Sequence, residues 1–405
     1  MDDRIILLSN SYPYSGEPFL KTEMGFLPEG ITVDVWPFFV DRARSHCGSA
    51  PSKIYPHLYD EPSGLEKIKC LFNALRMFFR EKEYRAAFAK KHPARNILKA
   101  IKFAYISEKR LVSIAKWLRK SKSQPGSPLI YAYWMYEVAY VGARLKTENP
   151  ECPFLTRCHG YDLYEIRHQN GYLPFRNFIL KNADLVCPIS ENGERYLQKL
   201  YGPEVGGKTY IARLGTVRKT AVSKSKVRED SIVLVSCSNL VEVKRVHLLI
   251  RALSKSKKPI HWYHFGDGEL RAGLEEQAKA LPDHITCTFM GFQANEDIQR
   301  FYAEHHINAF LNVSRSEGVP VSVMEAESYG IPIIATDVGG TSEIVHDREN
   351  GVLLAVDFTD QDLLAGIDDV LSHESEYSEN AIQTWEAMSN ADVVFPAFYE
   401  KLAEV

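Results

Sequence analysis

Short apolar runs alternate with amphipathic stretches along most of the chain. The first half has six such runs, rich in β-branched and aromatic residues, at 4–10, 32–38, 128–135, 153–160, 183–190 and 209–215. Each run ends in polar residues or glycine. Runs of this kind are typical of parallel strands that are buried on both faces. The pattern therefore predicts βαβ units and an α/β fold.

The pattern is interrupted once and then restarts. Residues 216–230 are polar and aperiodic, which is typical of a linker. Apolar runs follow at 231–239, 260–268, 284–291, 307–314, 331–337 and 351–357. A chain of 405 residues is too long for one core. We therefore expect two doubly wound, Rossmann-like domains, 1–215 and 231–384, with a helix at about 385–405 that packs back on the first. Their parallel sheets should face a central cleft.

Composition narrows the class of protein. Apolar residues make up 45% and charged residues 25%, as in ordinary globular proteins. The seven cysteines are scattered without a close pair, so neither a zinc ribbon nor a disulfide framework is expected. The sequence predicts no signal peptide and no membrane span, which makes the cytosol the expected compartment.

Positive charge is concentrated in one segment. Residues 66–123 contain 17 Lys and Arg against 4 Glu, although the whole chain has a net charge of −3. Apolar residues recur there at helical spacing, which indicates basic amphipathic helices. We expect this segment to bind an anionic membrane surface; the alternative is an ordinary core face backed by solvated lysines. Nucleic acid is not expected, because no module of stacking aromatic residues accompanies the charge.

The stretch 316–330, SEGVPVSVMEAESYG, places two glutamates around the start of an expected helix. Glu317 lies in the turn after a strand, and Glu325 lies about one and a half turns inside the helix. Pro320 has the φ suited to the first helical position, and Gly330 supplies a left-handed stop. The N–H groups at such a helix start favour a diphosphate. From the residues alone, a capping acid and a solvated helix glutamate remain the alternative.

The run from Ser314 to Leu354 resembles the signature of retaining glycosyltransferases of family 4, which have the two-domain GT-B fold, and the resemblance extends over nearly the whole chain. It implies that Glu317 contacts hydroxyls of the transferred sugar and that Glu325 binds the ribose of the nucleotide. The backbone expected to cradle the sugar and the diphosphate is that of Gly318, Val319, Val321 and Ser322. Pro320 stands where many members have glycine, so one backbone donor is missing. Glu327 has no counterpart and is expected to be a solvated helix residue.

The resemblance also assigns the cations of the donor site. Family members have a glycine–arginine pair and a later lysine that reach the donor phosphates. Here Asn239 replaces the arginine, Lys244 matches the lysine, and whether Arg245 substitutes is open. Fixed cations stabilise a leaving diphosphate without a metal, and no Asp-X-Asp motif stands at a plausible site. The other residues expected at the donor are Gly266, Gly268, Met290 and Gly291.

In the first half, residues 157–165, RCHGYDLYE, follow an expected strand. A lone histidine is more often a core or loop residue than a catalytic one. His159 and the glycine after it nevertheless resemble the family's pair at the cleft, which implies that His159 touches the donor sugar near its 6-position. Arg157 and Asp162 are candidates for acceptor contact or for orienting His159.

The loop after the first strand is a further candidate. Gly16 allows close approach to the backbone, as the glycine loop of the family's fold does, and the resemblance implies that it binds the donor. Glu17 and Glu23 either contact an acceptor or cap and solvate the first helix.

The resemblance implies a metal-independent, retaining hexosyltransferase in cell-surface polysaccharide synthesis. It would move a hexose or N-acetylhexosamine from a nucleoside-diphosphate sugar, with UDP favoured over GDP, to a glycan acceptor that is lipid-linked, on the inner face of the plasma membrane. A nucleotide-sugar 2-epimerase and a non-catalytic nucleotide-sugar-binding protein remain alternatives. An NAD-dependent oxidoreductase is not expected, because no G-x-G-x-x-G follows the first strand.

Overall fold

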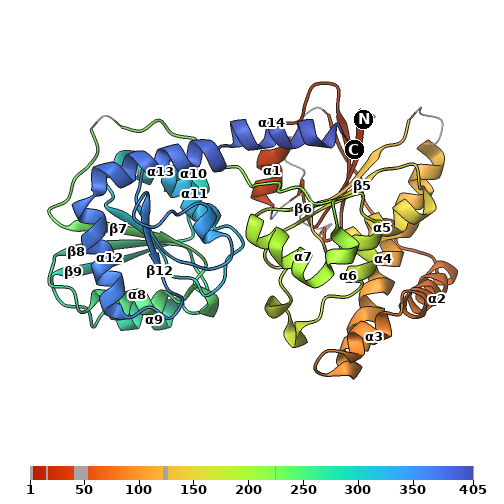
Figure 1. Cartoon of the computed structure of the whole chain (residues 1–405), viewed down its shortest axis with the longest axis horizontal. Coiled ribbons are helices and arrows are strands. Elements are labelled where there is room, and N and C mark those ends of the chain that lie inside the picture. The colour runs from red at the N-terminus through yellow and green to blue at the C-terminus, as the bar shows by residue number, and fades with distance from the viewer. Residues whose placement is uncertain (1–2, 15–16, 41–52, 122–125, 224, 405) are drawn as a thin grey trace. The chain divides into compact units, whose positions relative to one another are not determined.

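The chain folds into two compact units. The computed structural model describes residues 3–14, 17–40, 53–121, 126–223 and 225–404 (Figure 1). The first unit comprises residues 1–213 together with 395–405, and the second comprises residues 214–394. Each unit is built around one six-stranded parallel sheet, so the predicted pair of doubly wound α/β domains is confirmed.

The sheet of the first unit has the order β3-β2-β1-β4-β5-β6. Its strands are β1 (Arg4–Ser9), β2 (Thr32–Pro37), β3 (Ile54–Pro56), β4 (Leu129–Ala132), β5 (Phe154–Cys158) and β6 (Leu185–Pro188). All neighbours are parallel, and in the register of β1, Leu8 pairs with Trp36 on one side and Ala132 on the other. The strand order reverses between β1 and β4, so the carboxyl ends of these strands mark the point where ligands usually bind.

Helices cover both faces of this sheet. They are α1 (Pro18–Met24), α2 (Gly64–Arg80), α3 (Glu83–Phe88), α4 (Pro93–Ser121), α5 (Glu137–Glu148), α6 (Arg176–Asn182), α7 (Glu191–Val205) and α14 (Ala391–Leu402), with 3-10 turns at Glu165–Arg167 and Gln169–Gly171. In β1, Ile6 packs with α4 and α5, whereas Leu7 packs with α1 and the end of α14. Both faces of the strand are buried, which is why its sequence reads as a continuous apolar run.

The second unit repeats the plan with the order β12-β11-β10-β7-β8-β9. Its strands are β7 (Ile232–Cys237), β8 (Ile260–Phe265), β9 (Ile285–Gly291), β10 (Ala309–Asn312), β11 (Ile333–Thr336) and β12 (Gly351–Leu354). The helices are α8 (Val246–Leu253), α9 (Arg271–Ala278), α10 (Asn295–Glu304), α11 (Val321–Glu327), α12 (Asp360–Ser372) and α13 (Glu374–Met388), with 3-10 turns at Glu242–Lys244 and Thr341–Glu343. Figure 1 shows α8 and α9 on one side of the sheet and α10, α11 and α13 on the other. The order reverses between β7 and β10.

Eleven predicted strands are present and one is wrong. Residues 209–215 run beside β6 but form only an isolated bridge, between Thr209 and Val186. The carbonyls of Ala212 and Arg213 instead accept hydrogen bonds from the Arg157 guanidinium. The short strand β3 has three residues and ends at a proline, which is too brief for a pattern to reveal.

Candidate functional site

The candidate site of the second unit lies where the carboxyl ends of β7 and β10 meet. Lys244 ends the 3-10 turn after β7, and Glu317 lies in the loop after β10. The Lys244 Nζ is 2.6 Å from the Glu317 Oε1, and the Asn312 Nδ2 is 3.5 Å from the same oxygen. Both partners of the ion pair are mostly buried. The pair therefore joins the two strands at the reversal of strand order, the usual ligand position in such sheets.

Helix α11 begins beside this ion pair. Pro320 is the residue before the first helical turn, with φ −76° and ψ 108°, so the prediction that it is the first helical residue is off by one position. The helix begins at Val321, and Ser322 is in its first turn. First-turn N–H groups have no partner inside a helix and carry partial positive charge. Gly330 has φ +68°, as predicted for the residue that ends the helix.

Two glycines hold the backbone between Glu317 and α11. Gly339 has φ +61°, and a Cβ there would lie 2.0 Å from the Glu317 carbonyl oxygen, so no other residue fits. The next residue, Gly340, donates its N–H to the Gly318 carbonyl at 2.6 Å. Val319 is buried. The loop after β11 thus fixes the backbone that is predicted to surround a diphosphate.

The glycines after β8 have a packing role. A Cβ at Gly266 would lie 2.0 Å from the Ser238 carbonyl oxygen, and one at Gly268 would lie 2.4 Å from that of Leu240. The loop after β8 therefore lies against the loop after β7, in which Asn239 is exposed.

The loop after β9 joins the same edge of the sheet. Gly266 donates its N–H to the Gly291 carbonyl at 2.9 Å, and Met290 precedes that residue at the end of β9. All the predicted donor-site residues of the second unit therefore lie at or next to the carboxyl edge of its sheet.

The structure shows whether Arg245, the neighbour of Lys244, is available to contact donor phosphates. Arg245 has φ 52°, is 7% exposed, and donates to the carbonyls of Val313 at 2.8 Å and Val356 at 2.5 Å. Burial lowers the pKa of Arg245, and the nearby Arg315 lowers it further. Arg245 is thus a structural residue that ties β10 to the loop after β12, and it does not replace the missing arginine at position 239.

Glu325 lies on the helix that starts beside Glu317, and it is held by an unpredicted partner. Its Oε1 accepts a hydrogen bond of 2.7 Å from the Asn295 Nδ2, and Asn295 is itself held by Gln299 at 3.0 Å. Burial raises the pKa of Glu325, and the Asn295 hydrogen bond opposes that shift. Asn295 and Gln299 lie on α10, and nothing in their sequence context signals this role.

The prediction that Glu327 is solvated is wrong. Its side chain is fully buried, and its Oε1 accepts a hydrogen bond of 3.0 Å from the Asn350 Nδ2. The Oε2 atom is buried without a hydrogen-bond partner in the described part of the chain. Burial raises the pKa of Glu327 well above its ordinary value. The residue belongs to the support of α11.

Glu327→Gln should change how stability depends on pH. The native chain keeps a proton on Glu327 that the unfolded chain loses near the ordinary glutamate pKa, so the native state loses stability as pH rises above that value. The amide has no such dependence. The measurement is urea unfolding at pH 5.5 and 8. Between these values, we expect the free energy of unfolding of the variant to rise relative to that of the parent protein by up to about 1.4 kcal/mol per pH unit. A gap that is equal at both pH values would contradict the buried, protonated state.

In the first unit, His159 follows β5 and lies against aromatic rings. Its ring is 4.3 Å from that of Trp134 and 4.9 Å from that of Tyr133 between centroids. The side chain is nearly buried, and neither ring nitrogen has a hydrogen-bond partner among the described residues. The Nδ1 atom is 3.7 Å from an Asp162 oxygen, which is an ion-pair contact only if the ring is protonated. The imidazole is therefore positioned by packing, and the described residues leave both of its nitrogens free of hydrogen bonds.

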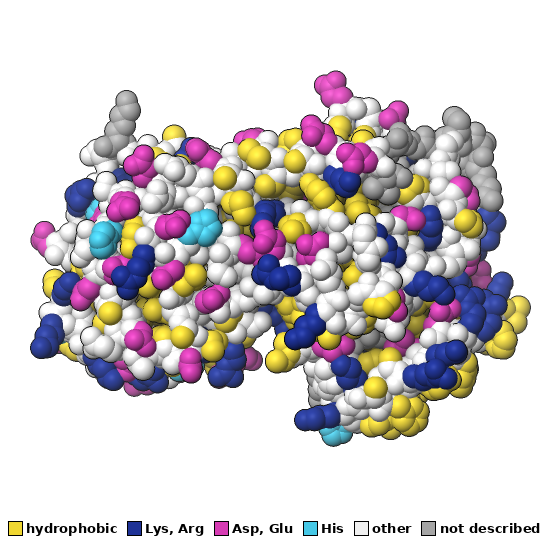
Figure 2. All heavy atoms as spheres, viewed as in Figure 1, with side chains coloured by type: hydrophobic (Ala, Val, Ile, Leu, Met, Phe, Trp, Pro, Cys, Tyr) yellow, Lys and Arg dark blue, Asp and Glu magenta, His cyan; other side chains and the backbone are white. Residues whose placement is uncertain are grey.

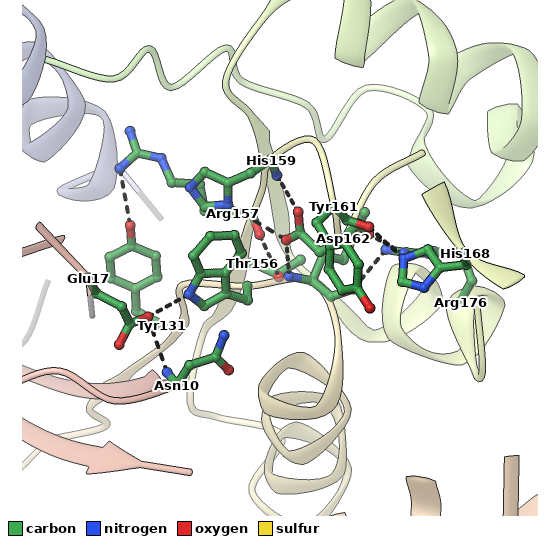
Figure 3. Close-up of polar contacts among 12 residues, drawn as sticks. Asn10, Glu17, Tyr131, Thr156, Arg157, His159, Tyr161, Asp162, His168 and Arg176 are labelled. Carbon is green, nitrogen blue, oxygen red and sulfur yellow. Dashed lines mark hydrogen bonds and ion pairs between the residues drawn. The ribbon is translucent and has the colours of Figure 1, made fainter. Parts of the chain in front are cut away.

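Asp162 holds the loop that carries His159 (Figure 3). Its carboxylate accepts the backbone N–H groups of His159 and Met135, both at 2.7 Å. Burial alone would raise the pKa of Asp162, but its contacts with the His159 side chain and these two N–H groups hold the pKa below the ordinary value. The buried Arg176 donates to the carbonyls of Asp162 and Met135. Of the two predicted roles, the geometry fits orientation of His159.

Glu17 is committed to the loop after β1. Its carboxylate accepts the backbone N–H groups of Asn10, Ser11 and Tyr12 at 3.2, 2.6 and 2.5 Å. It also accepts the Trp134 indole N–H at 2.5 Å. Because Trp134 packs on His159, Glu17 supports the histidine through the indole. Neither predicted role, acceptor contact or a solvated cap, describes this buried carboxylate. Trp134 was not predicted as a residue of the site. Its only indication in the sequence is that it is an aromatic residue just after a strand.

Arg157 and Glu23 form an ion pair in which both side chains are fully buried. Arg157 also lies 4.7 Å from the Phe398 ring of α14, and the Tyr131 hydroxyl donates to Glu23 at 2.8 Å. Contact of either side chain with an acceptor is therefore excluded in this structure. Their role is to join β5, α1 and α14. Gly16, also predicted at this end of the unit, lies outside the described residues.

Comparison with known proteins adds independent information. The sequence model of the family described as "Glycosyl transferases group 1" matches residues 217–387. The O-antigen biosynthesis glycosyltransferase WbnH of Escherichia coli is 30% identical over 185 residues, 41% of this chain and 51% of WbnH. The lipopolysaccharide core biosynthesis glycosyltransferase LpsE of Rhizobium meliloti is 27% identical over 244 residues, 58% of this chain and 68% of LpsE. The match thus spans only about half the length of WbnH.

Solved structures show the same fold over almost the whole chain. The lipopolysaccharide outer core galactosyltransferase WaaB in its apo form has a TM-score of 0.70 at 16% identity, covering 99% of both chains. HepE of Anabaena in complex with UDP has a TM-score of 0.67 at 16% identity, covering 99% of this chain and 100% of HepE. The predicted GT-B fold is confirmed.

Proposed function

We propose that the chain is a group 1 glycosyltransferase that transfers a sugar from a nucleoside diphosphate to a hydroxyl of a glycan acceptor in cell-surface polysaccharide synthesis; the family model that matches residues 217–387 supports this. The observation that carries this proposal is the group around the start of α11. Lys244 and Glu317 form their ion pair at the reversal of strand order, and Glu325 lies on the helix that begins there. The donor diphosphate would occupy the helix start, with the transferred sugar on the Glu317 side and the ribose on the Glu325 side.

The chemistry at this site is proposed to be electrostatic. When the sugar leaves, negative charge develops on the diphosphate, and Lys244 and the first-turn N–H groups of α11 would stabilise it. Glu317 would hold the hydroxyls of a hexose or N-acetylhexosamine, and His159 would contact the sugar from the first unit. We propose a metal-independent reaction that retains the configuration of the sugar. UDP is the favoured nucleotide, because HepE, which has the same fold, was solved with UDP.

The test is a panel of UDP- and GDP-sugars with a readout of nucleotide release, with and without a lipid-linked acceptor. We expect one donor to release nucleotide faster when the acceptor is present. Conversion of the sugar without nucleotide release would instead identify an epimerase, and saturable binding without turnover a binding protein. If no donor is bound or consumed, the proposal fails.

The surface of α2 supports a membrane partner for the first unit. Leu65, Ile68, Phe72 and Phe79 are 83%, 68%, 66% and 64% exposed, and we call them the α2 stripe. Their spacing of three, four and seven residues places them along one side of the helix. Figure 2 shows apolar and basic side chains gathered where Figure 1 labels α2 and α3. None of the described helices is long and apolar enough to cross a bilayer.

Cations lie beside this stripe. Lys69, Arg76 and Arg80 of α2 are exposed, and at 100° per residue they follow the stripe on one side of the helix. An apolar strip bordered by cations is the pattern of a helix that lies in the surface of an anionic bilayer. We therefore propose that residues 66–123 attach the protein to the inner face of the plasma membrane, where a lipid-linked oligosaccharide acceptor would be found.

Polar replacement of the α2 stripe should weaken membrane binding. Burial of one large apolar side chain contributes about 1.5–3 kcal/mol, so the double variant Ile68→Ser, Phe72→Ser should bind vesicles with 30% anionic lipid at least about tenfold more weakly. The control is Leu200→Ser on α7, which replaces an exposed apolar side chain of the same unit outside the stripe. Vesicle flotation measures both, and binding by the parent protein should fall at high salt. Equal flotation of the double variant and the control would reject the stripe as the attachment site.

A further inference from the structure

The first unit has a pocket at the carboxyl edge of its sheet, and none of the site residues predicted from the sequence lines it. Its volume is about 270 Å³, and it lies where β2 ends and the chain leaves β3. The residues that line it are Pro37, Phe38, Val40, Leu58, Tyr59, Glu61 and Arg110. Arg110 comes from the middle of α4, so the pocket lies between that helix and the end of the sheet.

The Arg110 guanidinium lies over aromatic rings in this pocket. Its guanidinium carbon is 4.7 Å from the centre of the Tyr59 ring and 5.8 Å from that of Phe38. Tyr59 is fixed in turn by its hydroxyl, 3.3 Å from the Trp36 carbonyl. The side chain of Arg110 forms no ion pair or hydrogen bond within the described ranges of the chain. A guanidinium that is stacked on rings and lacks an acid partner keeps its N–H donors for a ligand.

The local charge favours an anion. Glu61 also lines the pocket, but its Oε2 lies 3.5 Å from the Nζ of Lys67 and 3.5 Å from the Nζ of Lys109. The charge of Lys109 is the main reason that the pKa of Glu61 falls below its ordinary value, so this carboxylate stays ionised and paired. Arg110 is the cation that lines the pocket, and Lys67 and Lys109 lie beside Glu61, so three cations stand against two acids, Glu61 and the exposed Asp60. Among these described residues the net charge is therefore positive.

The pocket lies on the same sheet edge as the loop after β5 that carries His159. Phe38 and Phe39 donate their N–H groups to the carbonyls of Ser9 and Asn10, at 3.0 and 2.7 Å. The Asn10 N–H in turn donates to Glu17, which also accepts a hydrogen bond from the Trp134 indole that packs on His159. A continuous chain of contacts along the ends of β2, β1 and β4 thus leads from the pocket to His159.

We propose that this pocket binds an anionic group of the sugar acceptor, a phosphate or a carboxylate, through the Arg110 guanidinium. The planar fork of an arginine binds two oxygens of either group at once, and the rings behind it fix its orientation. The identification of the ligand as an acceptor rests on the proposed transferase function. The anion has two possible sources, the diphosphate of a lipid carrier and the carboxylate of an acidic sugar.

Binding of two small probes to the full chain separates these sources. Inorganic pyrophosphate represents the lipid diphosphate and glucuronate the acidic sugar; both are titrated by calorimetry in the presence of saturating UDP, which occupies the donor site. We expect at least one probe to bind, and Arg110→Gln to weaken its binding at least tenfold. Arg195→Gln, a change of an exposed arginine on α7, is the matched control and should bind like the parent protein. If the parent protein binds neither probe, or if both variants bind alike, the pocket is not an anion site.

Kinetics then connect the pocket to the acceptor. With the donor and acceptor found in the panel, Arg110→Gln should raise the acceptor KM at least tenfold while the donor KM and the acceptor-independent hydrolysis of the donor stay unchanged. Arg110→Lys keeps the charge but lacks the planar fork, so its acceptor KM should lie between those of the parent protein and Arg110→Gln. An unchanged acceptor KM would overturn the acceptor assignment. Failure of the transferase proposal is a different result, because donor turnover would then be absent from the parent protein as well.

Discussion

Glu317→Ala is expected to abolish sugar transfer while nucleotide affinity stays nearly intact. The Glu317 carboxylate is fixed by Lys244 and Asn312 at the start of α11, on the side assigned to the transferred sugar. Its loss removes contacts to the reacting sugar and leaves Lys244 without its acid, so the charge that faces the departing diphosphate is no longer positioned. Loss of one such electrostatic group costs about a hundredfold to a thousandfold in kcat. Single-turnover transfer measures the loss, and UDP titration should show an affinity within about threefold of the parent protein.

Glu325→Ala provides the contrast on the same helix. Glu325 is held by Asn295 on the side assigned to the ribose, so its removal should weaken UDP binding about tenfold or more, the usual cost of losing a hydrogen bond to a charged group. The chemical step at saturating donor should change less. Two variants that lose the same kinetic parameter would refute the division of roles between the two glutamates. Asn295→Ala should reproduce part of the Glu325 effect, because it releases the carboxylate without removing it.

The fold was predictable because burial on both faces of a sheet imposes continuous apolar runs. The same pattern was misleading at 209–215, where an apolar segment uses its carbonyls for Arg157 rather than for a ladder. No local signal could reveal that partner, since the two segments are 55 residues apart in sequence. Long-range pairing of this kind, not local propensity, decides such segments.

The candidate site shows the same limit at single residues. Lys244 and Arg245 are adjacent cations, yet one pairs with Glu317 and the other turns into the core, because Arg245 adopts a left-handed backbone at the start of α8. Glu325 and Glu327 are two positions apart on α11 and therefore point about 200° apart around the helix. Spacing predicts that they differ, but only the hydrogen bond from Asn350, in the loop before β12, shows that Glu327 is the one that is fully buried.

Arg157→Met is expected to destabilise the first unit by about 3–5 kcal/mol, the usual cost of breaking a buried ion pair by removing one partner. Glu23 would be left buried without its cation, and the carbonyls of Ala212 and Arg213 would lose their donor. Burial already raises the pKa of Glu23 against the influence of Arg157, so without that cation the carboxyl should take up a proton on folding. The midpoint of urea unfolding should therefore fall, and it should fall more at pH 8 than at pH 5.5.

The double variant Glu23→Gln, Arg157→Met decides between a structural and a ligand-binding role for this arginine. Adding Glu23→Gln to Arg157→Met removes the buried carboxyl and should recover part of the stability that Arg157→Met loses. The difference between the effect of the double variant and the sum of the two single effects measures the coupling of the pair. UDP binds to the second unit in the proposed mechanism, so its affinity should be unchanged in both variants. A structural arginine predicts lost stability with normal kinetics in whatever fraction is folded. If Arg157→Met instead folds as well as the parent protein and raises only the acceptor KM, the arginine binds the acceptor, and the buried state seen here is not the one that meets the substrate.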